Sequence, residues 1–249
     1  MAWQTPKTDW AAADGVRNTD FNRIEGNILE LYNGVARANL TVYVATTGSD
    51  TNGAGTSALP YATITKALNS IPKNLDGRTV VINIAAGTYA ETVSVNGFYG
   101  GMLRFSGSGT VTINNLDVRA CTLYVDNIVL ACTAGTGIIV TDNATLIVTS
   151  SVTLTSSTLG LLVTNCSSVH IGGNLSLTGM ATGIAASNNA RIFVSTISGS
   201  GIGTVMTASS GATIAYGSNS ATANTAIAAT STGGRINTGS QAGPGGGTL

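Results

Sequence analysis

Apolar and polar positions follow a repeating pattern along the second half of the chain. From Leu123 onward a short apolar β-type segment returns every 22 or 23 residues, centred on Leu123, Leu146, Val169, Ile192, Ile214 and Ile236. Solenoid proteins show a fixed period of this size, because each repeat buries its apolar side only against its neighbours. The period therefore predicts a solenoid.

Each repeat contains two further short segments with the same period. They recur at residues 137–143, 160–166 and 183–189, and at 128–130, 152–154 and 175–177. Three short strands per repeat, each followed by a turn, describe one coil of a single-stranded parallel β-helix. The fold class expected is all-β, with about seven coils over residues 79–238. The last coils carry few large apolar side chains, and the Gly-rich residues 239–249 are expected to form a flexible tail.

Residues 41–78 predict a strand and a helix that caps the first coil. An amphipathic helix is expected over residues 61–71, ended by Pro72. A solenoid must cover its first coil, which otherwise exposes apolar side chains and an unpaired strand edge.

Residues 1–40 form a separate, partly helical segment in this interpretation. Asn18 or Thr19 is expected to cap a short helix that runs to about Tyr32. A helix of this length needs a partner to be stable. We expect attachment and oligomer contacts at the apolar face and at two tryptophans that precede it, namely Trp3, Trp10, Phe21, Ile24, Ile28 and Leu31.

The charge pattern argues against two kinds of partner. Lys and Arg total 11, Asp and Glu total 11, and the net charge is +0. Without a basic run, nucleic-acid binding is not expected. No apolar stretch of about 18 residues predicts membrane insertion, and the first residues lack the apolar centre of a signal peptide, so synthesis in a cytosol is expected. The cysteines Cys121, Cys132 and Cys166 are then expected to be buried free thiols.

A column of turn residues recurs in successive coils and predicts a structural ladder. Its members are Asn143, Asn165, Asn188 and Asn189, with Asp142 and Cys166 beside them. Asn and Gly suit left-handed backbone positions, and stacked Asn amides can bond each other along the rod. Calcium-binding repeats need a regular Asp at such positions, so neither a metal nor another cofactor is expected.

Few residues are candidates for catalysis. From Leu103 onward the acids are Asp117, Asp126 and Asp142, at different repeat positions, whereas glycosidases need two carboxylates at a set separation. The single histidine, His170, is expected to point outward from its strand. Arg104, Arg119, Arg191 and Arg235 read as isolated, either on a solvated edge or, for Arg191 and Arg235, in a shallow site for an anionic sugar. No catalytic residues are assigned, and an enzyme is not expected.

Two parts of the chain carry a resemblance. Residues 43–50, 60–67 and 86–91 look like the entry to pectate-lyase-like right-handed β-helices, and residues 3–10 with 20–25 resemble the N-termini of phage and prophage tail appendage proteins. The resemblance implies a right-handed coil and a non-enzymatic component of a phage tail or tail-like particle. It further implies a homotrimer that docks on other tail or baseplate proteins through its N-terminus, contacts a host-surface glycan, and assembles in the host cytoplasm.

Two alternatives use the same fold. A polysaccharide-degrading tailspike needs carboxylates in a groove, within or between subunits. A solitary glycan-binding or ice-binding module needs a flat regular face, but threonines such as Thr141, Thr153 and Thr164 form no sustained array.

Overall fold

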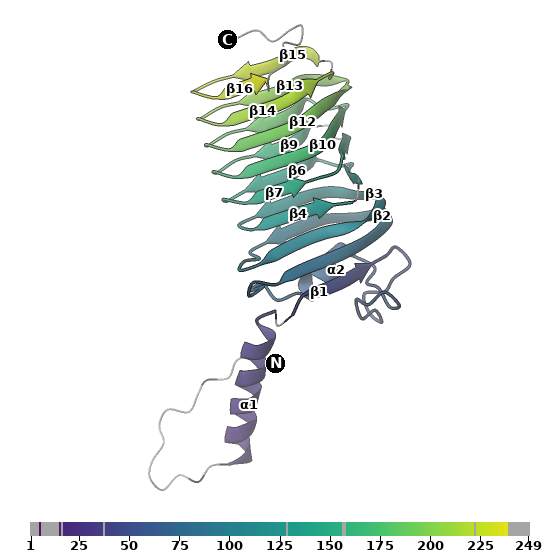
Figure 1. The fold of residues 1–249 in the computed structure, drawn as a ribbon, viewed down its shortest axis with the longest axis vertical. Helices are drawn as coiled ribbons and strands as arrows, with labels where there is room; N and C mark the ends of the chain where they lie inside the picture. The colour runs from purple at the N-terminus through teal and green to yellow at the C-terminus, as the bar shows by residue number, and fades with distance from the viewer. Residues whose placement is uncertain are drawn as a thin grey trace.

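The chain forms a rod of stacked β-coils from which one helix projects (Figure 1). The computed structural model describes residues 5, 15, 17–36, 38–127, 129–155, 158–221 and 223–238. Helix α1 (Asn18–Asn33) comes first, followed by strand β1 (Leu40–Val44), helix α2 (Ile64–Asn69) and the strands of the solenoid. These strands are β2 (Thr79–Asn96), β3 (Met102–Arg119), β4 (Thr122–Asp126), β5 (Val129–Cys132), β6 (Thr136–Thr141), β7 (Thr145–Val148), β8 (Val152–Thr155), β9 (Leu159–Val163), β10 (Ser168–Thr178), β11 (Thr182–Ala186), β12 (Arg191–Ser200), β13 (Ile202–Ala208), β14 (Thr213–Asn219), β15 (Ala223–Thr230) and β16 (Arg235–Thr238).

Every strand pairing in the solenoid is parallel, and each residue lies over its equivalent one coil earlier. The first segment of each coil pairs in one unbroken register through Val80, Leu103, Leu123, Leu146, Val169, Ile192, Ile214 and Ile236. The fold is thus the right-handed parallel β-helix that was predicted, with about six turns where the period suggested about seven. The thinner strands β14, β15 and β16 come last.

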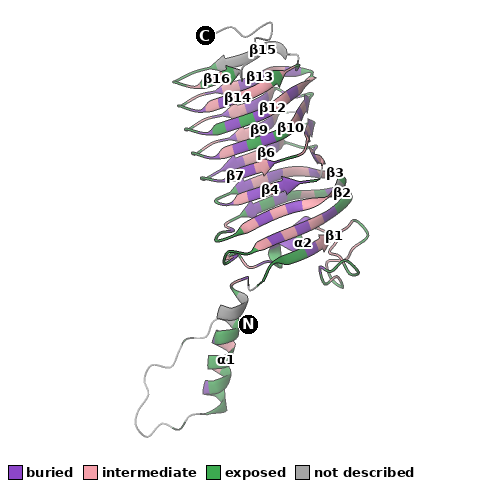
Figure 2. Ribbon diagram, viewed as in Figure 1, coloured by how far each residue is buried: buried purple, intermediate pink, exposed green. Residues whose placement is uncertain are grey.

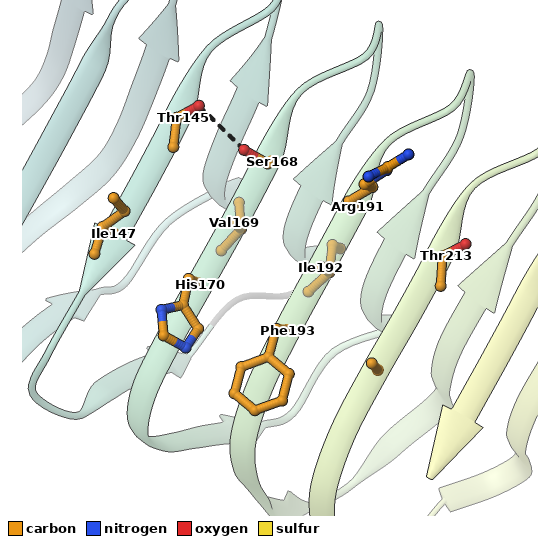
Figure 3. Close-up of a pocket in the computed structure, with 10 residues that line it drawn as sticks. Thr145, Ile147, Ser168, Val169, His170, Arg191, Ile192, Phe193 and Thr213 are labelled. Carbon is orange, nitrogen blue, oxygen red and sulfur yellow. Dashed lines mark hydrogen bonds between the residues drawn. The ribbon is translucent and has the colours of Figure 1, made fainter. Parts of the chain in front are cut away.

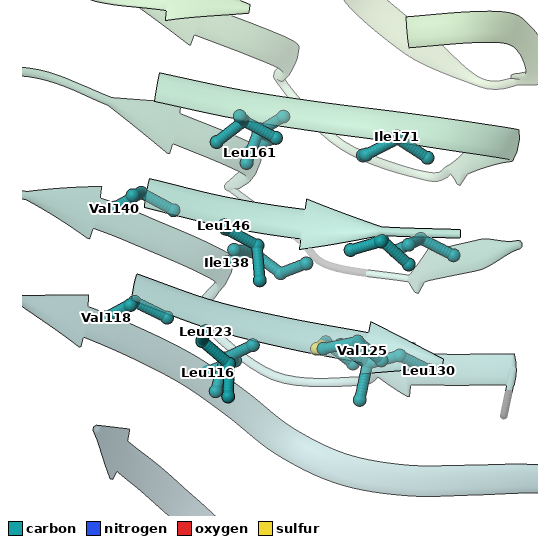
Figure 4. Packing of buried hydrophobic residues seen from close by; sticks show 14 of the residues in the cluster. Leu116, Val118, Leu123, Val125, Leu130, Ile138, Val140, Leu146, Leu161 and Ile171 are labelled. Atoms are coloured by element: carbon teal, nitrogen blue, oxygen red, sulfur yellow. The ribbon is translucent and has the colours of Figure 1, made fainter. Parts of the chain in front are cut away.

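The core lies inside the coils, because side chains alternate between the interior and the surface along each strand. In the third segment, the fully buried residues Leu116, Ile138, Leu161, Ile184 and Met206 stack through successive pairings. Figure 4 shows such aliphatic side chains layered on one another. Each contributes about 1.5–3 kcal/mol by leaving water, so the stacked columns supply most of the stabilisation.

The first coil is covered by β1 and α2, as the sequence predicted for residues 41–78. Strand β1 pairs with β2, and α2 buries Ile64, Ala67 and Leu68. The helix is shorter than the expected span of 61–71. It begins after Thr63, whose extended backbone and side chain cap it, and it ends at Ser70 before Pro72 is reached.

Two carboxylates explain why α2 starts late. Asp50 accepts hydrogen bonds from the backbone N–H groups of Ala62 and Thr63 and from the Thr63 hydroxyl, at 2.8, 3.1 and 2.7 Å. Burial opposes ionisation of Asp50, but these hydrogen bonds outweigh it and hold the pKa of the carboxyl below its usual value. Glu91, on β2, accepts from the N–H groups of Ile64 and Thr65 at 2.8 and 3.0 Å.

The link between α1 and the solenoid is short and ordered. Val35 bridges to Asn74, the N–H of Ala36 donates to the carbonyl of Asn74 at 2.9 Å, and Ala36 is buried. Asn74 in turn bridges to Tyr99. Helix α1 therefore continues from the base of the solenoid and extends away from it (Figure 1). The predicted tail, residues 239–249, lies outside the described residues.

Replacing Glu91 with Ala is expected to loosen the cap. The change leaves the Ile64 and Thr65 N–H groups without their carboxylate acceptor, which costs about 1–3 kcal/mol locally. Amide hydrogen exchange is expected to accelerate across residues 61–69 and to stay slow in the distant strand β9. Ser94→Ala, an exposed change on the same strand, is the control. Unchanged protection of α2 in the Glu91 variant contradicts this role.

Candidate functional site

Helix α1 exposes an apolar face. The side chains of Phe21, Ile24 and Ile28 are 56%, 47% and 59% exposed, and Figure 2 shows most of the helix as exposed. The spacings of three and then four residues are those of the a and d positions of a coiled-coil seam, and Leu31 continues them. The structure describes only the backbone of Leu31, and Trp3 and Trp10 lie outside the described residues.

The start of α1 is organised by Asp20. Its carboxylate accepts a hydrogen bond from the N–H of Arg17 at 3.0 Å and pairs with the guanidinium of Arg23 at 3.2 Å. The carbonyl of Arg17 also accepts from the N–H groups of Asp20 and Phe21. The helix is therefore capped from Arg17 and Asp20, one or two residues from the expected Asn18 or Thr19.

The turn that follows the third segment of each coil forms a polar ladder. Its two central residues have left-handed backbones in four successive coils, with φ between 49° and 77° at Asp142, Asn143, Asn165, Cys166, Asn188, Asn189, Ser210 and Gly211. The amide of Asn188 donates to Oδ1 of Asn165, and the amide of Asn165 donates to Oδ1 of Asp142, each at 3.1 Å.

Only part of the predicted Asn column forms side-chain hydrogen bonds between coils in the described structure. Asn165 and Asn188 bond along the rod through their amides, and they also donate to Thr141 and Thr164. Asn143 and Asn189 pass hydrogen bonds through the backbone instead, since their N–H groups donate to the carbonyls of Asn165 and Ser210. The ladder holds the turns in register.

The three acids considered for catalysis already have partners. Asp117 pairs with Arg119 at 2.9 Å, and Asp126 pairs with Arg104 at 2.6 Å. Asp142 belongs to the ladder. Within the described residues, no group of three or more His, Cys, Asp or Glu side chains could hold a metal ion.

Two arginines are not isolated, contrary to the prediction. Arg104 and Asp126 lie 22 residues apart, which is one coil, so the parallel register brings them together. The repeat period was the signal that could have revealed this pair. The Asp117 and Arg119 side chains are two residues apart on one strand and point to the same side.

The prediction of three buried thiols is wrong for one of them. Cys121 and Cys132 are buried, whereas Cys166 is exposed. Burial raises the pKa of the Cys132 thiol to about 12 and also raises the pKa of Cys121. Cys166 lies at a left-handed turn position, where its side chain points away from the core.

A groove crosses the outer surface of strands β7, β10, β12 and β14 (Figure 3). It has a volume of about 540 Å³ and is lined by two columns of outward side chains, first Thr145, Ser168, Arg191 and Thr213, and then Ile147, His170, Phe193 and Ala215. His170 is exposed, as expected from its strand position, and its ring centroid lies 4.9 Å from that of Phe193. Sequence reasoning did not bring Phe193 together with His170 and Arg191.

Comparisons with known proteins do not extend this description. No protein-family model, no curated protein and no solved structure matches the chain. Among the described residues, neither helix has the length and apolar character needed to cross a bilayer.

Replacing Asn165 separates the two roles of a ladder residue. Asn165→Ala removes the amide and forces a Cβ-bearing residue without a polar side chain into a backbone of φ 54°, and is expected to cost about 1–3 kcal/mol. Asn165→Gly removes the amide without that strain and is expected to cost less. Urea unfolding followed by circular dichroism measures both. A Gly variant as stable as the original chain shows that the amide ladder contributes nothing.

The thiols are expected to differ sharply in reactivity. Cys166 is expected to react rapidly with Ellman's reagent in the folded protein, while Cys121 and Cys132 react only after denaturation, because burial suppresses their thiolate forms. Cys166→Asn, which copies the residues Asn143 and Asn189 of the same column, is expected to abolish the rapid phase. A rapid phase that survives in this variant contradicts the assignment.

Proposed function

We infer that the chain is a non-enzymatic structural component of a phage tail or phage-tail-like particle, such as a tail fibre, a spike or a baseplate appendage. It would assemble in the cytoplasm of the bacterial host and contribute to attachment at the host surface. The observation that carries the proposal is the exposed apolar face of α1, on a helix that projects from the base of a rigid rod.

The α1 face supports assembly through the N-terminal segment. A 16-residue helix is marginal on its own, and its apolar residues gain stability only when another surface covers them. Seam positions occupied by Phe21, Ile24, Ile28 and Leu31 suit a bundle of parallel copies. Ile at both a and d positions favours three or four strands over two, which supports a homotrimer that would join other tail or baseplate proteins at this end.

The solenoid supports a spacer role. Its coils stack in one register from β2 to β16, so that the rod places its distal strands far from α1 (Figure 1). Its three acids from Leu103 onward are held by Arg119, by Arg104 and by the Asn165 amide. This pairing favours a structural part over the polysaccharide-degrading alternative, whose chemistry needs one carboxylate as an acid and another as a nucleophile or base.

The solution mass of the full chain tests the proposal. Light scattering on a sizing column is expected to give three times 24.9 kDa. Ile24→Glu puts a charge on the seam and is expected to give a mass of 24.9 kDa, because burying an unpaired carboxylate between helices is unfavourable. The circular dichroism of the β-strands is expected to persist.

Leu59→Glu provides the matched control, since Leu59 is equally exposed but lies in the loop that precedes α2. Its mass is expected to stay that of the original chain. A monomeric original chain contradicts the trimer, and an unchanged mass in the Ile24 variant shows that α1 is not the assembly surface.

A further inference from the structure

We propose that the groove on β7, β10, β12 and β14 binds an anionic oligosaccharide whose chain lies along the rod. The inference deepens the proposed attachment function and rests on it only for where the ligand is met. The binding event itself depends on the groove alone.

The floor of the groove suits the apolar face of a sugar ring. Ile147, His170, Phe193 and Ala215 stand in one column on successive strands, and Phe193 is 41% exposed although it is large and apolar. The tilted pair of His170 and Phe193 rings, with centroids 4.9 Å apart, presents aromatic surface to the outside. Aromatic side chains with a few well-placed polar groups are typical of ligand sites.

The neighbouring column supplies polar groups along the same direction. Hydroxyl groups of Thr145, Ser168 and Thr213 flank the guanidinium of Arg191, and the Thr145 and Ser168 hydroxyls lie 3.1 Å apart. Hydroxyl groups both donate and accept hydrogen bonds, as the hydroxyls of a sugar require. A column of hydroxyls beside an apolar column therefore matches both faces of a carbohydrate chain.

Arg191 gives the groove its preference for an anion. Its side chain is exposed, and in the part of the chain that the structure describes it has no carboxylate partner, unlike Arg104 and Arg119. Arg235 stands in the same column two coils further on, about 10 Å away at the usual strand spacing. A guanidinium binds a carboxylate or a phosphate through two parallel hydrogen bonds, so a polymer with spaced anionic groups can contact both.

The dimensions favour an oligosaccharide over a protein partner. The groove spans four strands, about 14 Å along the rod, and its volume of about 540 Å³ is that of a small-molecule site. A stable protein interface needs about 800 Å² from each partner, far more than two columns of four side chains offer. The apolar face of α1 already provides a surface for assembly.

The experiment measures binding of the full chain to an array of oligosaccharides. The array carries carboxylated and phosphorylated members and the neutral counterpart of each, so that the source of the anion is distinguished. Anionic members are expected to bind, and their neutral counterparts are expected to bind at least about tenfold more weakly. Titration of the strongest member then compares variants.

Two variants test the two columns separately. Phe193→Ala removes the aromatic floor, and Arg191→Gln removes the charge while keeping hydrogen-bond donors. Each is expected to weaken binding at least about tenfold, and the advantage of the anionic member is expected to shrink in the Arg191 variant and at high salt. The matched controls are Tyr99→Ala and Arg78→Gln, which change exposed residues near the base of the solenoid and are expected to bind as the original chain does.

Three outcomes overturn the proposal. They are no binding to any anionic member, equal binding by neutral members with no effect of Arg191→Gln, and a fall in solution mass caused by Phe193→Ala, which would make the groove a contact between subunits. A monomeric original chain that still binds through Phe193 and Arg191 leaves this inference standing while the trimeric assembly fails, so the two proposals fail separately.

Discussion

The in-register stacking of parallel coils is the constraint on which the rest of the structure depends. Each backbone amide on a strand bonds to the coil beside it, and each side chain lies on its equivalent about 4.8 Å away. A residue type that suits one position therefore suits the whole column, as Leu123, Leu146 and Val169 show in the core. A poorly chosen residue is felt by the coils on both sides, because the solenoid has only nearest-neighbour contacts.

The same stacking governs polar groups. Isolated surface charges contribute little, but an amide in a column has a neighbour of the right kind at hydrogen-bond distance, as Asn165 and Asn188 do. Asp142 ends this ladder by accepting from Asn165. Where the column changes from one residue type to another, as between Arg104 and Asp126, charges from adjacent coils meet. Ladder and ion pairs together leave Arg191 and Arg235 as the exposed cations of the first-segment face.

A stack of coils has two ends, and each needs a different solution. At the first end, β1 and α2 cover the core, with Asp50 and Glu91 holding the start of α2. Helix α1 then leaves this capped end with its apolar residues uncovered. An element with this face is stable when other chains cover it, which ties assembly to the base of the rod and leaves its sides free for ligands.

The sequence by itself determined the solenoid, the position of its cap and the left-handed turns, because the period, the apolar alternation and the Asn residues are local properties repeated many times. It also placed Phe21, Ile24 and Ile28 on one helical face. Only the tertiary structure decided that α2 begins at Ile64, that Arg104 meets Asp126, that Cys166 is exposed, and that His170, Phe193 and Arg191 share a groove. These outcomes depend on the exact register between coils and on which side chains meet across it, and a one-residue change in register would move every side chain to the other face of its strand.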